Sequence, residues 1–313
     1  MRFIRSSFSP GLQALKRVVQ SAFRLLGYEL HRIQTDADRY RYYMAQPWVG
    51  ILKPCDGIDF TPHCQLQFIR EILPIYYAEY ANLPRNESDN PEGFYLNNGY
   101  FGPIDAEVLY TVVRHWRPSL IIEVGSGFST RLIRLALDVG KISCQLVCID
   151  PEPRASIVGI ADRHIAAPVE SVSPELFRNL QSNDILFIDS SHQIIPGGDV
   201  VYLVCEILPI LNPGVLVHFH DIRLPFEYSA FELQHLYTEQ YLVQAFLCGN
   251  SMFDVLFAGH YLGAYYPGEL LARIPGIQEG RMSGSLWLRR KVFSNPATEP
   301  GMLTNATISC PAS

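Results

Sequence analysis

Four acidic residues each end an apolar segment in the middle of the chain. They are Glu123 in LIIEVGSGFST, Asp150 in CID, Asp189 in DILFID and Asp221 in GVLVHFHD. Where such segments form parallel strands, their carboxyl ends meet at one edge of the sheet, and open α/β folds bind ligands at that edge. The sequence therefore predicts one polar site assembled from residues that lie far apart along the chain.

The turn that follows Glu123 contains Gly125 and Gly127. Glycine lets a ligand approach the backbone closely, and the free N–H groups at the start of the next helix can bind it. A dinucleotide site has a third glycine for the pyrophosphate, but this chain has Thr130 at that position. Glu123 would repel a pyrophosphate, whereas it attracts the sulfonium and ammonium groups of S-adenosylmethionine. The turn therefore favours S-adenosylmethionine, and a nicotinamide-dependent oxidoreductase is the alternative.

Asp150 ends the next apolar segment along the chain. A carboxylate at this place accepts hydrogen bonds from the two ribose hydroxyls of a nucleoside cofactor. Both cofactor classes contain that ribose, so Asp150 predicts a nucleoside without choosing between them. The predicted contacts to the cofactor are Glu123, Gly125, Ser126, Gly127, Ser129, Asp150, Asp189 and Ser190.

Apolar runs and helical patterns alternate over most of the chain. The predicted strands are Leu120–Val124, Cys144–Asp150, His164–Ala167, Asp184–Asp189, Gly214–His220, Phe253–Ala258 and Ser285–Arg289. The predicted helices are Leu66–Tyr80, Asp105–Trp116, Thr130–Val139, Pro174–Leu180, Asp199–Leu211 and Phe226–Phe246. Strands that are apolar throughout and alternate with helices form a parallel sheet covered on both faces. The predicted fold is α/β, with a doubly wound, mainly parallel, seven-stranded sheet.

Residues 1–33 are basic, and Glu29 is their only acid. Apolar residues recur there at helical spacing, at Leu12, Leu15, Val18, Val19, Ala22, Leu25 and Leu26. One interpretation is a helix that lies weakly on an anionic membrane surface. The other, which we favour, is a helix docked on its own domain or on a partner subunit of a homo-oligomer.

We expect three regions along the chain. Residues 1–95 contain the basic helix and a helical or irregular cap, residues 96–292 form the cofactor-binding domain, and residues 293–313 form a flexible tail.

The composition is that of a globular protein. The 313 residues are 48% hydrophobic and 18% charged, enough for one large domain or two ordinary ones. A net charge of −6 argues against nucleic acid as a partner. The seven cysteines form no CxxC pair, which argues against a zinc ribbon or a disulfide framework. We expect reduced cysteines and a cytoplasmic location.

The ordered motifs EVGSG, CIDP, DILFIDSSH and LPILNPGVLVHFHDI, followed by GSLWLRR, make the chain similar to a known family. The sequence resembles the class I S-adenosylmethionine-dependent methyltransferases, and within them the branch with DxSH and HDI motifs that includes the sugar O-methyltransferases of macrolide biosynthesis. The resemblance covers residues 95–290, and it implies a Rossmann-like methyltransferase fold. It departs from the family at the family's own third glycine, which is Ser129 in this chain, one position before the third glycine of a dinucleotide site.

This resemblance implies roles for the residues beside the cofactor. Asp189 and Asp221 match ligands of a divalent metal, expected to be Mg²⁺, and His192 matches the general base, with Asp189 also catalytic. A sulfonium leaves as a neutral thioether and needs little acid catalysis, whereas an alcohol must lose its proton. A histidine can take that proton, and a metal can lower the pKa of the alcohol. His220 replaces an acid of the family's metal site and suits a softer metal than Mg²⁺.

The implied activity is methylation of a hydroxyl on a sugar or other small bacterial metabolite. A non-catalytic protein that keeps the fold is a further alternative, although an inert scaffold has no need of Asp189, His192 and Asp221. Glu239 in TEQYL is predicted to be helical, and it either faces the site or has a solvated or capping role.

Overall fold

The computed structural model divides the chain into two compact units, Met1–Pro47 and Trp48–Ser313. It describes residues 10–28, 38, 41–43, 45–274 and 282–291, so the predicted flexible tail lies outside the described residues. The division falls ahead of the predicted boundary at residue 95. Residues 48–95 belong to the same unit as the sheet, because Phe68, Leu73 and Tyr80 are buried in its core.

The first unit contains the basic helix expected near the start of the chain. This helix, α1 (Pro10–Leu25), has no acid in its first turn and has Arg24 in its last. Leu15, Val18 and Phe23 are exposed on it. No helix in the described part of the chain is both long enough and apolar enough to cross a membrane. What this helix contacts stays a prediction.

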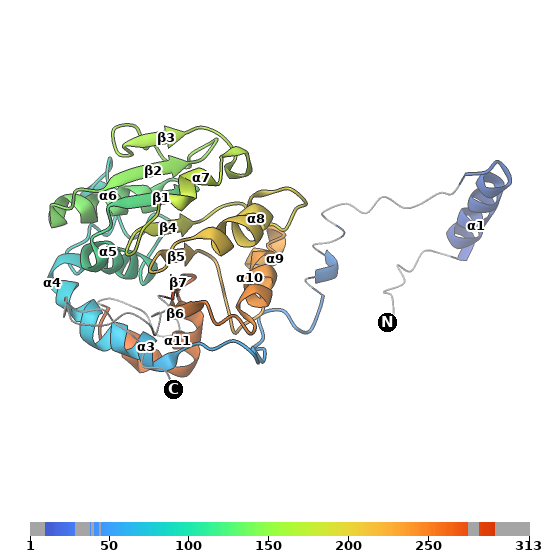
Figure 1. Cartoon of the computed structure of the whole chain (residues 1–313). Coiled ribbons are helices and arrows are strands. Elements are labelled where there is room, and N and C mark those ends of the chain that lie inside the picture. Colours follow the sequence, from blue (N-terminus) through green and yellow to red (C-terminus); the bar gives the residue numbers. More distant parts are fainter. Residues whose placement is uncertain (1–9, 29–37, 39–40, 44, 275–281, 292–313) are drawn as a thin grey trace, which may run out of the picture. The chain divides into compact units, whose positions relative to one another are not determined.

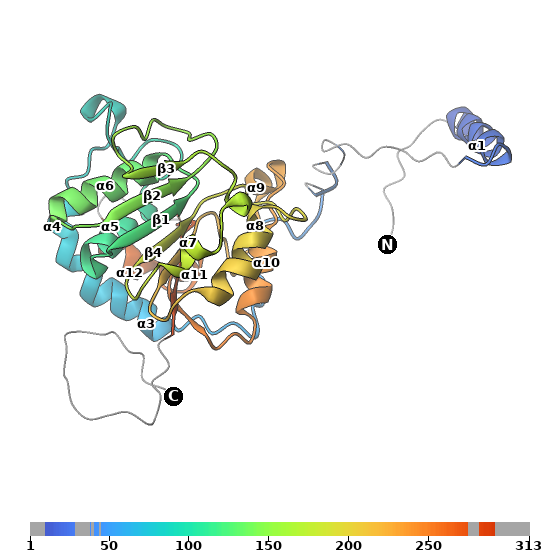
Figure 2. The ribbon, with the colours of Figure 1, turned by 45° about the horizontal axis from the view of Figure 1, so that its top comes forward.

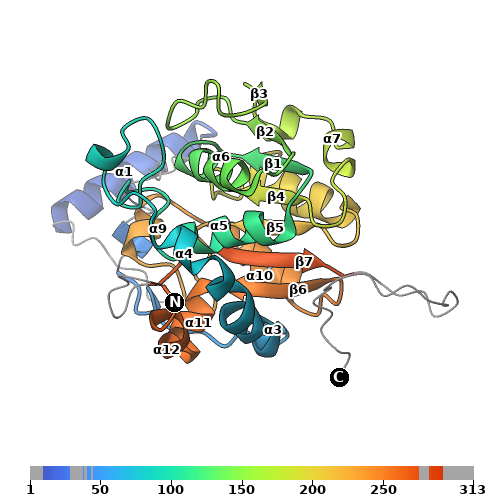
Figure 3. The same ribbon diagram turned by 90° about the vertical axis from the view of Figure 1, so that its left-hand side faces the viewer.

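The second unit is built on a seven-stranded sheet with the order β3-β2-β1-β4-β5-β7-β6 (Figure 1). The strands are β1 (Leu120–Val124), β2 (Gln145–Ile149), β3 (Arg163–Ile165), β4 (Ile185–Ile188), β5 (Leu216–Phe219), β6 (Phe253–Ala258) and β7 (Leu286–Arg290). The first five are parallel, β7 lies between β5 and β6 and runs antiparallel to both, and β6 is the edge strand opposite β3 (Figure 3). The predicted doubly wound, mainly parallel sheet is confirmed.

Strand order locates the ligand crevice. The chain proceeds from β1 outward through β2 to β3, and then returns to place β4 on the other side of β1. Such a reversal opens a crevice at the carboxyl ends of the two central strands. The register pairs Glu123 on β1 with Phe187 on β4, so the segments that follow β1 and β4 leave the sheet side by side.

Helices cover both faces of this sheet (Figures 1 and 2). The helices of the unit are α3 (Pro62–Gln67), α4 (Tyr77–Tyr80), α5 (Asp105–Trp116), α6 (Phe128–Gly140), α7 (Glu175–Arg178), α8 (Asp199–Tyr202), α9 (Ala230–Gln234), α10 (Glu239–Leu247), α11 (Gly259–Tyr265) and α12 (Pro267–Leu271). Helices α5 and α6 pack with Ile121 and Ile185 on one face. Helices α8 and α10 pack with Ile122 and Leu186 on the other. Successive strand residues point to opposite faces, so both faces are apolar.

One predicted helix is wrong. The segment Phe226–Phe246 forms two helices, α9 and α10, instead of one. Leu236 between them has φ 59°, in the left-handed region where a helix cannot continue. The break lets α10 begin at Glu239, beside the loop after β4.

The cysteines are mostly, but not all, free. Cys55, Cys144, Cys148, Cys205 and Cys248 carry free thiols. Cys64 is disulfide-bonded, so the expectation of reduced cysteines is wrong for this residue.

Candidate active site

The glycine turn after β1 packs directly on the end of β4. Gly125 has φ +81°, and a Cβ there would overlap the backbone carbonyl oxygen of Asp189. Only glycine fits, both because of the positive φ and because of this close approach. The turn leads at once into α6, which begins at Phe128.

Glu123 is fully buried beneath this turn. The hydroxyl of Ser129 donates to its Oε1 at 2.7 Å, and that of Thr130 donates to its Oε2 at 2.6 Å. The Cys148 thiol lies 3.2 Å from Oε2. Burial raises the pKa of Glu123 to about 7, although these three donors oppose the rise. The hydroxyl of Thr130 also accepts from the N–H of Gly127, so the carboxyl group anchors the turn to α6.

A cavity of about 600 Å³ opens at the crevice between β1 and β4. Its wall includes Gly125, Ser126, Gly127, Ser129, Asp150, Asp189 and Ser190, as the sequence predicts. Glu123 is not part of this wall. Glu123 holds the turn instead. Because it does not line the cavity, the direct contact with a cationic cofactor predicted for it is not supported.

Two wall residues carry hydroxyls with unused hydrogen-bonding capacity. The Oγ atoms of Ser126 and Ser190 are buried and have no hydrogen-bond partner among the described residues. Buried polar atoms normally have partners. These hydroxyls are therefore available to a polar ligand in the cavity.

Asp150 joins the glycine turn to the segment after β2. Its Oδ2 accepts from the N–H of Ser126 and its Oδ1 from the N–H of Glu152, both at 2.7 Å. Each oxygen has a further lone pair, so the carboxylate remains able to accept from ribose hydroxyls. The backbone bonds fix the direction of the carboxylate before a ligand arrives.

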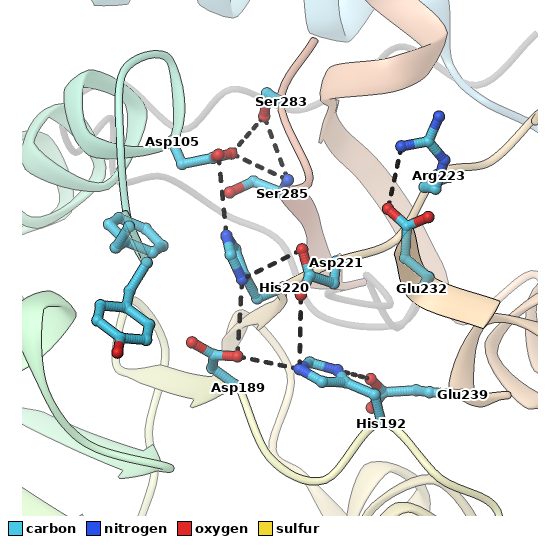
Figure 4. Close-up of polar contacts among 12 residues, drawn as sticks. Asp105, Asp189, His192, His220, Asp221, Arg223, Glu232, Glu239, Ser283 and Ser285 are labelled. Carbon is cyan, nitrogen blue, oxygen red and sulfur yellow. Dashed lines mark hydrogen bonds and ion pairs between the residues drawn. The ribbon is translucent and has the colours of Figure 1, made fainter. Parts of the chain in front are cut away.

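Beyond the cavity, ionisable side chains from four segments meet around Asp189 (Figure 4). Its Oδ1 lies 3.2 Å from Nε2 of His192 and 3.6 Å from Nδ1 of His220. Asp221 lies 3.7 Å from each of these two nitrogens. The two imidazoles and two carboxylates form one connected group, which we call the junction cluster.

His192 is almost fully buried in the junction cluster. Its Nδ1 lies 2.8 Å from Oε2 of Glu239, at the start of α10. Burial disfavours the imidazolium, but the bonds with Asp189 and Glu239 outweigh it and raise the pKa of His192 to about 10. His192 is therefore a cation at neutral pH in the protein alone.

His220 is arranged in a similar way on the opposite side. Its Nε2 lies 3.8 Å from Oδ2 of Asp105, the first residue of α5. Burial opposes the charged form of His220, yet Asp221 and Asp189 raise its pKa well above the ordinary value. Burial likewise opposes the charged form of Asp189, but His220 and His192 hold its pKa well below the usual range.

The backbone is strained at this cluster. His192 has φ 59° and Asp221 has φ 55°, and Ile104, just before Asp105, has φ 77°. Non-glycine residues in such conformations cost about 1–3 kcal/mol each and gather at functional sites. The fold therefore holds these side chains at a cost in stability.

A second cavity of about 400 Å³ lies on the other side of the junction cluster. Its wall is mainly polar, with Asn97, Tyr100, Asp105, His220, Asp221, Arg223, Glu232 and His260. Tyr100 lines both cavities, whereas His192 lines neither. Asp189 in the first cavity and His220 in the second are in direct contact, so the junction cluster separates two adjoining chambers.

The predicted Mg²⁺ ligands do not form a magnesium site. Imidazole nitrogens lie 3.2–3.7 Å from the oxygens of Asp189 and Asp221, and they occupy the side on which the two carboxylates face each other. In the described parts of the chain, no group of three or more His, Cys, Asp or Glu side chains is arranged to hold a metal. Mg²⁺ requires a near-octahedral set of oxygens.

Sequence patterns missed part of this site. Asp105, Arg223 and Glu232 belong to no motif, and only the fold brings them to the second cavity. Glu239 proves to face the site, at a sequence separation of 47 residues from His192. The run of acids and histidines after strands was the one signal available.

Comparisons with known proteins agree with this geometry. Residues 122–222 match the family model described as a methyltransferase domain. That segment runs from β1 to just past β5, and it contains the glycine turn, Asp150 and the junction cluster residues Asp189, His192, His220 and Asp221. The match supports the class I S-adenosylmethionine-dependent methyltransferase expected from the sequence.

A relative described as an uncharacterized protein of Archaeoglobus fulgidus is 32% identical over 139 residues. The match covers 41% of this chain and spans 61% of the length of that relative.

Similar solved structures include the O-methyltransferase TomG from Streptomyces achromogenes in complex with S-adenosylmethionine. It is 14% identical with a TM-score of 0.40, and the match covers 83% of this chain and 100% of that chain. Another is the Podospora anserina methyltransferase PaMTH1 bound to S-adenosylhomocysteine, at 15% identity and a TM-score of 0.39, covering 84% and 100%. A third is a Thermobifida fusca protein described as a putative methyltransferase, at 14% identity and a TM-score of 0.40, covering 73% of this chain and 94% of that chain.

Proposed function

We propose that this chain is an S-adenosylmethionine-dependent methyltransferase that methylates a hydroxyl of a small polar acceptor, of the sugar or glycan-like kind. The observation that carries the proposal is the pair of cavities that adjoin at the junction cluster. One is bounded by the glycine turn and Asp150, and the other by polar side chains.

The first cavity suits a nucleoside cofactor without phosphate. Its volume of about 600 Å³ lies in the range of small-molecule sites. Asp150 offers acceptors for ribose hydroxyls, and Ser126 and Ser190 offer free hydroxyls. Asp189 gives this chamber a carboxylate with a lowered pKa, which attracts a sulfonium and would repel a pyrophosphate.

The second cavity suits a polar acceptor with several hydroxyl groups. Its wall provides acceptors on Asp105, Asp221 and Glu232 and donors on Arg223 and Asn97. Nε of Arg223 is buried and has no partner within the described residues. Such a wall recognises hydroxyls by paired donors and acceptors, and an apolar acceptor would leave these groups unpaired.

The reaction moves a methyl group from one chamber to the other. The sulfonium carbon–sulfur bond breaks, a bond from that carbon to the acceptor oxygen forms, and the neutral thioether leaves. The hydroxyl proton passes to the junction cluster. Because the imidazoles of this cluster are coupled, the proton is taken up by the group as a unit.

His192, the base implied by the resemblance, lines neither cavity, so within that unit it receives the proton by way of the carboxylates of Asp189 and Asp221. Its raised pKa makes it an imidazolium in the protein alone, so it must first lose a proton. A bound sulfonium favours that loss, because a nearby cation lowers the pKa of an imidazole. His220, which faces the second cavity, is the imidazole nearer to the acceptor.

Turnover assays test this proposal. The full chain is incubated with S-adenosylmethionine and a panel of monosaccharides, glycosides and polyols, and formation of S-adenosylhomocysteine is measured. We expect turnover with at least one of them, and His192→Gln should remove it while cofactor affinity is kept. Turnover in His192→Gln equal to that of the wild type would contradict the base assignment. Binding of NADH, followed by its fluorescence, would favour the oxidoreductase instead.

A further inference from the structure

The loop that carries His192 is held from two sides. On one side, Asp199 of α8 accepts from the N–H and the hydroxyl of Ser191, both at 2.7 Å. On the other, the N–H groups of Thr238 and Glu239 donate to the carbonyl of His192 at 2.8 and 3.0 Å. The loop is thereby fixed to the start of α10 by its backbone.

The side chain of Glu239 adds a contact of a different kind. It is 1% exposed, and its Oε2 lies 2.8 Å from Nδ1 of His192. Its other oxygen, Oε1, is buried and has no hydrogen-bond partner in the described part of the chain. A buried carboxylate with an unpartnered oxygen costs free energy. The pair with His192 offsets part of this cost, and the unpartnered Oε1 is the part of the side chain that packing does not explain.

The geometry gives a functional reason. The two nitrogens of an imidazole lie on different sides of the ring, so an acceptor that holds Nδ1 also sets the direction of Nε2. With Nδ1 at Glu239, Nε2 of His192 lies 3.2 Å from Asp189 and 3.7 Å from Asp221 (Figure 4). The ring of Tyr237, whose centroid is 4.4 Å from that of His192, covers one face of the imidazole.

We propose that Glu239 is a positioning residue that acts through His192, fixing a proton on Nδ1 and aiming Nε2 at the carboxylates between the two cavities. This inference rests on the proposed function for its catalytic meaning, but the positioning itself is a property of the protein alone. Glu239 touches neither cavity, so its effect on an acceptor passes through the imidazole.

Glu227 provides a matched control. It is also 1% exposed and also contacts α10, through Gln240 and Tyr241, and it pairs with Lys53. It has no contact with His192, and it lines neither cavity. Loss of its charge perturbs the packing of α10 without changing the partner of Nδ1.

The test is NMR spectroscopy of the full chain with ¹⁵N-labelled histidine rings. There are nine histidines, and His192→Gln identifies the signals of His192. We expect a slowly exchanging Nδ1–H signal that is lost or moves upfield in Glu239→Gln, remains in Glu239→Asp and is unchanged in Glu227→Gln. Glu239→Gln nearly preserves side-chain shape, and a melting curve shows that it is folded. An unchanged His192 signal in folded Glu239→Gln would overturn the proposal.

Kinetics provide the second readout. With an acceptor found by turnover, Glu239→Gln should lower kcat by about 10²-fold, the usual scale for acid–base groups, and leave the KM for S-adenosylmethionine unchanged. Equal losses in Glu239→Gln and Glu227→Gln would mean that Glu239 has only a packing role. Calorimetry with S-adenosylhomocysteine separates the two proposals: absence of binding to the wild type refutes the methyltransferase, whereas the NMR result alone decides the role of Glu239.

Discussion

Glu123 lies near the end of β1 and Asp189 follows the neighbouring parallel strand β4, yet the pKa values of their carboxyl groups shift in opposite directions. Glu123 at the end of β1 is enclosed by hydroxyls and a thiol, and burial raises its pKa to about 7. Asp189 after β4 keeps 31% of its side chain exposed and lies between two imidazoles that lower its pKa. The turn that Glu123 holds and the segment that begins with Asp189 meet at Gly125, which packs on the backbone carbonyl of Asp189.

The difference shows that position at a strand end does not decide the role of an acid. Neutral donors satisfy Glu123 without supplying a positive charge, so burial keeps its pKa raised and the group serves to hold the turn. Cationic partners keep Asp189 ionised at the edge of a cavity, where it can act on a ligand.

Gly125→Ala should have the largest effect on stability, because Gly125 is where the turn after β1 packs on the end of β4. The added methyl would overlap the carbonyl oxygen of Asp189, and φ is +81°. We expect a loss of about 3 kcal/mol or more in the free energy of unfolding, from strain and overpacking together, measured by urea denaturation. In Gly127→Ala the nearest atom to the new methyl is 3.6 Å away, so that variant should be nearly as stable as the wild type. Equal stability of both variants would contradict the close contact.

Glu123→Gln should change how stability depends on pH. The raised pKa of Glu123 means that the folded state binds more protons than the unfolded state between about pH 4.5 and 7. Stability from this group is therefore lost as pH rises through that window, by at most about 3 kcal/mol at about 1.4 kcal/mol per pKa unit. The wild type should therefore lose stability relative to Glu123→Gln as pH rises from 4.5 to 8.

Asp189→Asn should show the opposite sign. Because the pKa of Asp189 is lowered, its stabilisation is present above the unfolded pKa, near 4, and is lost only as pH falls below it. The gap between wild type and Asp189→Asn should therefore be constant from about pH 5 to 6, below the ordinary pKa of the histidines that Asp189 contacts, and should close in acid. A pH dependence of the same sign in both variants would refute the contrast between the two acids.

Asp150→Asn should weaken S-adenosylhomocysteine binding by about 10–100-fold, because hydrogen bonds to a charged group contribute about 1.5–3 kcal/mol. Asp162→Asn is the control: Asp162 bonds Arg134 and the N–H of Leu146 and lies outside the first cavity. Calorimetry measures both variants. Wild-type affinity in Asp150→Asn would show that the ribose lies elsewhere.

Chelation should have the smallest effect. The carboxylates of Asp189 and Asp221 already have imidazole partners, so we expect EDTA to change the Kd for S-adenosylhomocysteine by less than about twofold, or about 0.4 kcal/mol. A larger loss of affinity, restored by Mg²⁺ or another divalent ion, would show that a metal belongs to the site.

Much of the frame of this site could be predicted from the sequence. Apolar runs such as Ile185–Ile188, buried on both faces, leave a strong pattern, and their ends located Asp150 and Asp189. The break at Leu236 could not be predicted, because nothing in its residue type demands a left-handed conformation.

The chemical states of the side chains were harder to predict. The role of Glu123 depends on the hydroxyls of Ser129 and Thr130 in the first turn of α6, which reach it because of the phase of that helix. Glu239 and Asp105 reach their histidines only through the tertiary fold, and no local pattern records those contacts.

Calorimetric titration of the full chain with S-adenosylhomocysteine shows whether the chain binds the cofactor of a methyltransferase. We predict binding of one molecule per chain, weakened in Asp150→Asn and kept in Glu227→Gln. Two results together would refute the methyltransferase. Neither S-adenosylhomocysteine nor S-adenosylmethionine would give heat at several temperatures, and NADH would bind.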